Sequence, residues 1–545
     1  MDKTKEWELE MLMEKLRAKT GQFKSFYDSA KALRMALLEK RYPVDSVERS
    51  QLHKCLDTLQ HNIKVTTVQA MVERLESVSR QLGLKFVAGP SGLDFFISTD
   101  MFYLELVLEP SGGVKDVKVH HEGKVEQPQS CEELVACLSR RDFSDFTAQL
   151  EGLASIYQLN AEKKVKCKAY AALTSLETDL QTLASLQSYI KEPYNLVHKS
   201  PVGILHKRRG GHCMKLVYFV SQYDLLDPVN KVTRPLTESL EVGHSVTVCM
   251  EGSSAHKLQT STLVSINRST KICTPVYAPL TSQNSASLPA CFVLKLHQPM
   301  PVCLALVHRI QSVTEIECGD LSNPSPLLSL ITQHVSQGKL DTRGLLVNLP
   351  DQQHCYFMTD SPQLDAVLIH NIPFSLPQHV PQILSLLRQQ ALFNSVVSSC
   401  IRLNTRHGDK TAMLEEPALS WQLPRGPLDH LLEESRDLDK TVMLEVSALS
   451  WQRLSVSLEH PLEESMATVE LDLSDITQPT CKIYTAAGDT SPDYATKVFQ
   501  RCLSIPVTMR ALIKCWQREG SGMKEASESS NNGPMGGLGG LPGGG

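Results

Sequence analysis

The sequence lacks long hydrophobic runs and paired cysteines. No uncharged apolar stretch is long enough to cross a membrane, a task that takes about 18 or more residues. The first residues, MDKTKEWELEMLMEKL, are charged and helix-periodic, whereas a secretory signal has an uncharged core. The 15 cysteines stand singly, without a CxxC pair, and several lie in apolar runs. Free cysteine packs as a small hydrophobe, so we expect a reducing compartment, no disulfide framework and no zinc site.

Catalytic signatures are also missing. There is no glycine-rich phosphate loop, GxGxxG or HExxH pattern. The stretch GHSVT begins like a nucleophile elbow, but Thr247 stands where the sharp turn needs a second glycine. Neighbours on a strand point to opposite faces, so the pairs His212–Cys213 and His354–Cys355 are expected to share neither a proton nor a metal. We therefore expect no catalytic, cofactor-binding or metal-binding residue and no enzyme activity; an active site assembled from distant residues is the alternative.

A basic excess is absent as well. The chain has 60 acidic and 55 basic residues, a formal charge of −5, whereas a polyanion-binding surface needs a basic surplus. We expect no direct nucleic-acid or membrane partner. The one basic cluster, His206–Arg209, is either a nuclear import signal or phosphate contact, or an ordinary solvated loop.

What is present is the composition of a globular protein. With 545 residues, 41% apolar and 21% charged, the chain should form two to four domains. The predicted fold class is α+β and multidomain: an N-terminal helical region, then mixed hairpin and helix domains, then a disordered Gly-rich C-terminal tail. The predicted segments are a helical region (1–83), hairpins plus helices (84–191), a linker (192–212), a strand-rich α+β domain (213–401), a duplicated excursion (402–438), four strands plus a helix (439–518) and the tail (519–545).

Individual elements follow from apolar periodicity and from turn residues. Helices are predicted at 144–157, 162–190, 301–313, 325–337, 379–401 and 492–517, and Pro506 should kink or split the last. Strands are predicted at RGLLVNL and HCYFMT, and at 441–449, 453–459, 467–473 and 480–485. Ser130 and Glu133 have the spacing of a capping box that opens a further helix.

One internal repeat stands out. Residues 409–438 and 439–468 are identical at 17 of 30 positions. A single duplication is not a solenoid. The second copy keeps strand alternation, with Leu454, Val456 and Leu458 on one face. The corresponding part of the first copy contains two prolines and a glycine, which interrupt a strand, so we expect an exposed excursion there.

The first copy contains an LxxLL pattern, Leu428, Leu431 and Leu432. On a helix these leucines form one apolar face that fits a partner's groove. The alternative is accidental spacing, because Leu431 aligns with Pro461 in the other copy. Docking and coincidence both stay open, and the three leucines are the candidate partner-docking residues.

Several long stretches, in order along the chain, resemble subunit 1 of the animal Mediator complex. They include STDMFYLELVLEPSGGVKDVKV (98–119), LPACFVLKLHQPMPV (288–302), QQHCYF (352–357) and RCLSIPVTMRA (501–511). The resemblance covers roughly residues 10 to 515. It implies a nuclear transcription coactivator, a non-catalytic scaffold in the middle module of Mediator that bridges DNA-bound activators and RNA polymerase II.

The resemblance also bears on partners. Members of this family bind nuclear hormone receptors through LxxLL boxes in a long segment beyond the folded part. Here the sequence ends in a short Gly-rich tail without an LxxLL, so no box position carries over, and Leu428, Leu431 and Leu432 lie elsewhere. We expect contacts with middle-module subunits, and only indirect contact with RNA polymerase II. A second hypothesis is a short competitor form that lacks the receptor-binding tail.

Overall fold

The computed structural model describes most of the chain in two compact units. The first unit comprises Met1–Tyr170 and Arg208–Cys213, and the second comprises Ala171–Lys207 and Met214–Gly545. Within these, the structure describes residues 30–35, 51–56, 58, 64–122, 129–187, 189–221, 225–227, 232–233, 243–267, 273–319, 321–402, 441–463, 465–486 and 493–530. No helix in these ranges is long and apolar enough to cross a membrane.

The first unit is built on a five-stranded antiparallel sheet in the order β1-β2-β3-β4-β5. Its elements are α4 (Val68–Gln81), β1 (Lys85–Ala88), β2 (Asp94–Ser98), β3 (Phe102–Leu108), β4 (Val114–His121), β5 (Gln129–Ser130), α5 (Glu132–Ser139), α6 (Phe143–Ser155) and the start of α7 (Lys163–Ser185). Alternate residues of β3 are buried, and Leu104 and Leu106 face Ile97 and Val117 on the neighbouring strands. The two predicted hairpins are therefore confirmed, and together they form one sheet.

Local sequence signals explain most helix ends in this unit. Thr67 caps α4, because its side-chain oxygen accepts a hydrogen bond from the Ala70 amide at 3.2 Å. The helix ends before Gly83, which has a φ of +68° that favours glycine. The predicted capping box is wrong: α5 begins one residue later than it requires, with Cys131 as its N-cap. The Ser130 hydroxyl instead bonds to the Asp116 carboxylate on β4, so strand pairing decides the helix start.

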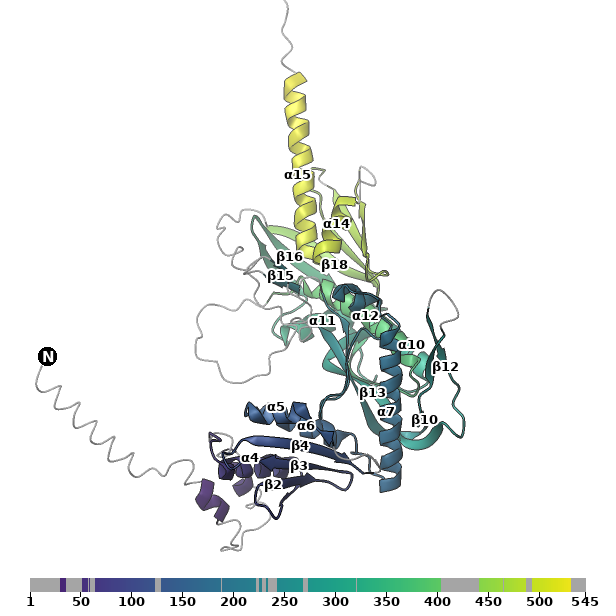
Figure 1. The fold of residues 1–545 in the computed structure, drawn as a ribbon. Coiled ribbons are helices and arrows are strands. Elements are labelled where there is room, and N and C mark those ends of the chain that lie inside the picture. Colours follow the sequence, from purple (N-terminus) through teal and green to yellow (C-terminus); the bar gives the residue numbers. More distant parts are fainter. Residues whose placement is uncertain are drawn as a thin grey trace, which may run out of the picture. The chain divides into compact units, whose positions relative to one another are not determined.

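The second unit contains two six-stranded sheets. The first has the order β14-β17-β13-β10-β7-β6. Its strands are β6 (Ile204–His206), β7 (Lys215–Phe219), β10 (His244–Gln259), β13 (Ser285–Cys303), β14 (Ser325–Pro326) and β17 (Asp365–Phe374). Two small hairpins accompany it, β8 (Leu226–Asp227) with β9 (Val232–Thr233) and β11 (Val264–Asn267) with β12 (Thr274–Tyr277). The helices of this part are α8 (Pro193–Lys199), α10 (Leu304–Thr314), α11 (Leu327–Ser336) and α12 (His379–Ser398), and α10, α11 and α12 pack together beside the sheet (Figure 1).

The second sheet has the order β15-β16-β18-β19-β20-β21. Its strands are β15 (Arg343–Leu349), β16 (Gln352–Thr359), β18 (Thr441–Ser450), β19 (Arg453–Glu459), β20 (Met466–Asp472) and β21 (Thr480–Tyr484). All neighbours are antiparallel except β16 and β18, which pair in parallel. Leu454, Val456 and Leu458 lie buried on one face of β19, as the second repeat copy predicts. The helices α14 (Asp493–Cys502) and α15 (Ile505–Ser530) follow, so the predicted split next to Pro506 is confirmed.

A buried arginine ties α12 to distant parts of the second unit. Arg388 is 5% exposed, and its guanidinium donates to the backbone oxygens of Tyr218 at 2.9 Å, Val197 at 3.0 Å and Ser200 at 2.7 Å. Burial lowers the pKa of Arg388 to about 10, so the side chain is still a cation at neutral pH. The three carbonyls partly compensate the buried positive charge, and the guanidinium in turn supplies the hydrogen-bond donors that these buried carbonyls need.

A buried carboxylate on α7 accepts hydrogen bonds from a distant segment of the second unit. Asp179 is fully buried and accepts hydrogen bonds from the Gln259 side chain at 2.7 Å and from the amides of Leu263 and Val264 at 2.9 and 3.0 Å. Burial raises the pKa of Asp179 above its usual value. The carboxylate thus fixes the turn between β10 and β11 to the helix.

Two expectations for regular structure need correction. The predicted linker at 192–212 contains α8 and β6 instead of a continuous loop. β13 continues to Cys303, so the helix predicted from 301 begins at Leu304. Helix α15 continues past the predicted helix end at 517 as far as Ser530, and residues 531–545 of the predicted tail lie outside the described part.

Candidate interaction surfaces

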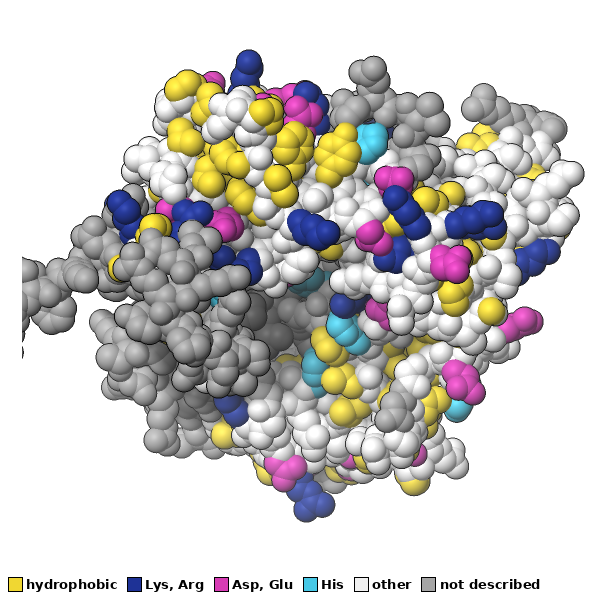
Figure 2. Space-filling view, turned by 90° about the horizontal axis from the view of Figure 1, so that it is seen from below, with side chains coloured by type: hydrophobic (Ala, Val, Ile, Leu, Met, Phe, Trp, Pro, Cys, Tyr) yellow, Lys and Arg dark blue, Asp and Glu magenta, His cyan; other side chains and the backbone are white. Residues whose placement is uncertain are grey.

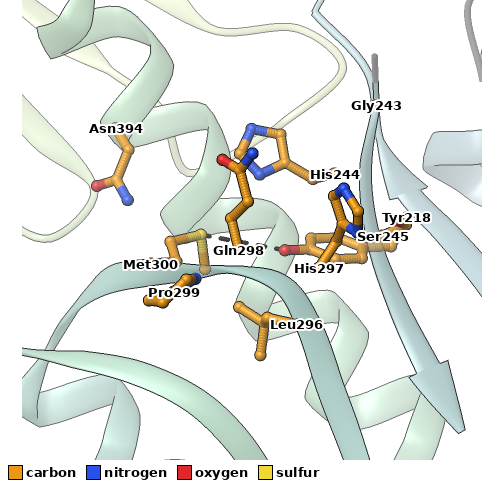
Figure 3. Close-up of a pocket in the computed structure, with 10 residues that line it drawn as sticks. All are labelled: Tyr218, Gly243, His244, Ser245, Leu296, His297, Gln298, Pro299, Met300 and Asn394. Atoms are coloured by element: carbon orange, nitrogen blue, oxygen red, sulfur yellow. Dashed lines mark hydrogen bonds between the residues drawn. The ribbon is translucent and has the colours of Figure 1, made fainter. Parts of the chain in front are cut away.

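A small cavity lined by several polar side chains lies where β13 bulges away from its neighbours. Between Lys295 and Met300 the register of β13 against β17 shifts, and the bulge presents His297 beside His244 of β10 (Figure 3). The cavity measures about 30 Å³, enough for one or two water molecules. A small-molecule site usually needs about 300 Å³ or more. The bulge therefore leaves a hydration pocket rather than a substrate site.

Two of the polar side chains around this cavity, those of Tyr218 and Asn394, have partners within the protein. The Tyr218 hydroxyl points to the Met300 sulfur at 4.0 Å, and the Asn394 amide donates to the Pro301 carbonyl at 2.9 Å (Figure 3). Burial lowers the pKa of His244 to about 4, so the imidazole is neutral at pH 7. No carboxylate lines the cavity to orient this histidine as a base.

The catalytic candidates from the sequence are structural side chains. Ser245 of GHSVT is 4% exposed within strand β10, so it does not occupy the sharp turn of a nucleophile elbow. His354 is fully buried, with Nδ1 2.8 Å from the Tyr356 hydroxyl and Nε2 2.9 Å from the Gln352 side-chain oxygen. Gln352 offers an acceptor, so Nε2 carries the proton and Nδ1 accepts from Tyr356. In the ranges that the structure covers, no three His, Cys, Asp or Glu side chains converge as metal ligands.

In the first unit, the loop that follows the basic cluster is pressed against α6. The Gly211 backbone is so close that an added Cβ would lie 1.7 Å from the Gln149 carbonyl oxygen. His212 Nε2 lies 2.7 Å from the Asp145 carboxylate. The backbones of Arg209 and His212 pair in an isolated antiparallel β-bridge. The loop at 208–213 is therefore ordered rather than an extended basic peptide. Its use as an import signal stays a prediction.

The LxxLL residues Leu428, Leu431 and Leu432 lie outside the described residues. Their docking role stays a prediction. The second repeat copy is described, and there Leu462, the counterpart of Leu432, lies in the turn between β19 and β20 with 51% of its surface exposed.

The second sheet of the second unit has apolar side chains on both faces. One face is core, whereas on the other Leu346 of β15 faces Cys355 of β16, which faces Met443 of β18. Leu346 and Met443 are 43% and 55% exposed, and Met466 of β20 is 62% exposed. We call Leu346, Cys355, Met443 and Met466 the apolar row. Glu459 of β19 lies between Met443 and Met466, so the row is apolar with one charged side chain within it. Exposed apolar side chains grouped on one face mark an interaction surface in many soluble proteins.

Periodicity did not single out the apolar row. TVMLEVSAL at the start of β18 has an apolar residue at an outward position, Met443, between two inward ones. The sequence signal for the row is this apolar residue at an outward position, and it can be interpreted only when the neighbouring strands are known. Leu346 and Met443 are nearly 100 residues apart in the sequence, and β16 brings them together.

Comparison with known proteins identifies the family. The model of the family "Mediator of RNA polymerase II transcription subunit 1" matches residues 53–402. The chain belongs to this family. A relative of the same name from Drosophila melanogaster is 42% identical over 542 residues, which cover 95% of this chain and 34% of the relative. Relatives of that name from Xenopus laevis and Xenopus tropicalis are each 36% identical over 525 residues, covering 92% of this chain and 32% and 31% of their own lengths. The chain thus spans about a third of the curated relatives it matches.

The Mediator subunit 1 family model ends before the second sheet is complete. Its matched region contains β15 and β16, whereas β18 to β21 begin at Thr441. Tyr356 of β16 pairs with Leu444 of β18, so strands inside and outside the matched region share one sheet. The apolar row likewise draws Leu346 from the matched region and Met443 and Met466 from beyond it. The fold unit of this family member therefore extends past the matched region.

Proposed function

We propose that this chain is a non-catalytic subunit of the Mediator complex and acts in the nucleus. The single observation that carries the proposal is the family match over residues 53–402, supported by 42% identity to the Drosophila relative across 95% of the chain. The relatives are named for RNA polymerase II transcription, and this role is carried over from them. In this proposal the chain contacts other subunits of the middle module and bridges transcription activators to RNA polymerase II.

The structural support comes from surfaces. The apolar row exposes three large side chains on a six-stranded sheet whose opposite face is fully packed. A rigid sheet presents such side chains with little loss of conformational freedom on binding. We assign the apolar row to contact with another Mediator subunit.

Affinity purification from nuclear extract tests the proposal. A tagged chain should co-purify with middle-module Mediator subunits, whereas their absence from the eluate would refute the assignment to Mediator. The variant Met443→Glu should reduce recovery of those subunits several-fold, because it places a charge in the centre of the apolar row. Val276→Glu is the matched control, since Val276 is 46% exposed on β12 and outside the row. Equal recovery with both variants would move the contact to another surface.

A further inference from the structure

A groove between α10 and α12 in the second unit has no role in the function proposed above. It measures about 560 Å³, several times the volume of one aliphatic side chain. The residues that form its walls are Arg309, Ser312 and Val313 of α10 and Pro381, Gln382, Ser385 and Leu386 of α12. Their spacings of three and four residues put each set on one side of its helix. Two helix faces side by side form the kind of trough that accepts a third helix.

The charge of the groove has one sign. Arg309 is the only charged side chain that lines it, and it forms no ion pair with any carboxylate of the described residues. Glu315, at the C-cap of α10, is the nearest acidic residue along that helix, and it does not line the groove. At the start of α12 the amides of His379 and Val380 bond to the carbonyls of Leu376 and Pro377, so Arg309 alone gives the groove its charge.

The Arg309 side chain is already held in place. Its guanidinium carbon lies 5.8 Å from the centre of the Trp451 ring, in the turn between β18 and β19. Stacking on an aromatic ring restricts an arginine while leaving its N–H groups free to bind a carboxylate in a two-point fashion. Val313, Pro381 and Leu386 supply hydrocarbon next to this cation. An acidic partner gains from both features and a neutral one from the hydrocarbon alone, whereas a basic one is repelled.

We propose that the α10–α12 groove binds an acidic amphipathic helix of a partner protein. Apolar side chains at i, i+3 and i+4 of that helix enter between Val313, Pro381 and Leu386, and a carboxylate at its edge pairs with Arg309. The apolar part supplies affinity, and the ion pair selects acidic over basic helices and fixes the register. The proposal is independent of assembly into Mediator, because it concerns binding to the isolated chain.

Fluorescence anisotropy with the full chain tests the proposal. The probe is a labelled peptide with the sequence of residues 426–438, GPLDHLLEESRDL, which combines leucines at the required spacing with several carboxylates. We expect saturable binding that weakens at high salt, as pairing of partly exposed charges does. A peptide with Glu433→Lys and Glu434→Lys should bind at least tenfold more weakly. A peptide with Leu431→Ala and Leu432→Ala should lose binding even at low salt.

Variants of the chain locate the site. Arg309→Glu should weaken binding at least tenfold, whereas Arg343→Glu, the same charge change at an exposed position of β15, should not. Ser385→Trp fills the groove from an exposed position of α12 and should block binding without removing any packed side chain. Circular dichroism confirms that each variant is folded, and Ser385→Trp decides the matter if Arg309→Glu does not fold.

Three results would overturn the proposal. One is the absence of binding to the unmodified chain together with its appearance after deletion of 409–438, which would make the chain's own leucines the occupant. Another is no binding to either form. The third is equal affinity for the unmodified chain, Arg309→Glu and Ser385→Trp, which would place the peptide elsewhere.

Discussion

Replacement of Arg388 by methionine should be among the most destabilising single changes in the second unit. Methionine keeps most of the hydrocarbon volume but removes all donors, so the backbone oxygens of Val197 and Tyr218 lose the guanidinium, and that of Ser200 keeps only the long bond from the Gly203 amide at 3.4 Å. An unsatisfied buried acceptor costs about 1–3 kcal/mol, so these losses together cost about 3–8 kcal/mol. Removal of the buried charge offsets part of this loss, because burying a guanidinium away from water is itself unfavourable. We expect a net loss of about 3–5 kcal/mol in the free energy of unfolding.

Urea unfolding followed by circular dichroism measures this loss. Arg343→Met is the matched control: Arg343 is exposed on the edge strand β15, and its replacement should change stability by less than about 0.5 kcal/mol. Arg388→Lys should be intermediate, since one ammonium group cannot span three carbonyls as a planar guanidinium does. Hydrogen exchange adds a local readout, because the three carbonyls belong to α8, to its C-cap Ser200 and to β7, and the amides of α8 and β7 should exchange faster in the methionine variant.

One outcome would refute this reasoning. If Arg388→Met unfolded within about 1 kcal/mol of the unmodified protein, with α8 equally protected, the three hydrogen bonds would not be what holds α8 to α12. The desolvation of the guanidinium would then cost as much free energy as its three hydrogen bonds contribute, as happens for some buried ion pairs.

Three further predictions concern other close contacts. Gly211→Ala should release the 208–213 loop from α6, because the new Cβ would collide with the Gln149 carbonyl; faster tryptic cleavage after Arg209 would show it, and unchanged cleavage would contradict it. Asp179→Asn should cost about 2–3 kcal/mol in urea unfolding, since its amide group turns donors toward backbone donors; an unchanged midpoint would count against the carboxylate anchor. Burial lowers the pKa of His354 to about 4, so the unfolded chain binds a proton first as pH falls below about 6.5. Stability should therefore drop between about pH 6.5 and 4, by on the order of 3 kcal/mol from this group, and His354→Gln should flatten that part of the pH profile.

Elements with strong local signals could be predicted from the sequence. RGLLVNL coincides with β15, and the four strands predicted after residue 440 correspond to β18 to β21 within one or two residues. Their apolar alternation is strict on the core face, and polar turns separate them. The helices at α6, α11 and α12 also agree closely, since each buries a wide apolar stripe.

Features that depend on distant partners could not be predicted. The sequence around Ser130 predicts a helix cap, but in the structure its hydroxyl bonds to Asp116 on β4 instead. The linker at 192–212 looks like a loop because its order comes from Arg388, almost 190 residues away. An arginine inside an apolar helix indicates a surface stripe by composition alone, and only the packed structure shows three carbonyls converging on it. The apolar row and the α10–α12 groove are hidden for the same reason.

The repeat shows why similar sequences need not occupy similar places. The second copy forms β18, β19 and the following turn, with Leu454 and Val456 directed into the core. β16 pairs directly with β18, so the sheet has no position between them for a strand from the first copy. A sheet accepts a further strand only at an edge, and the prolines of the first copy remove the donors that such pairing needs. Identity at 17 of 30 positions thus keeps leucines and carboxylates in the first copy, whereas its prolines do not suit a central strand. That combination is the chemistry of an acidic amphipathic segment, which is why this stretch serves as the probe for a cationic, apolar groove.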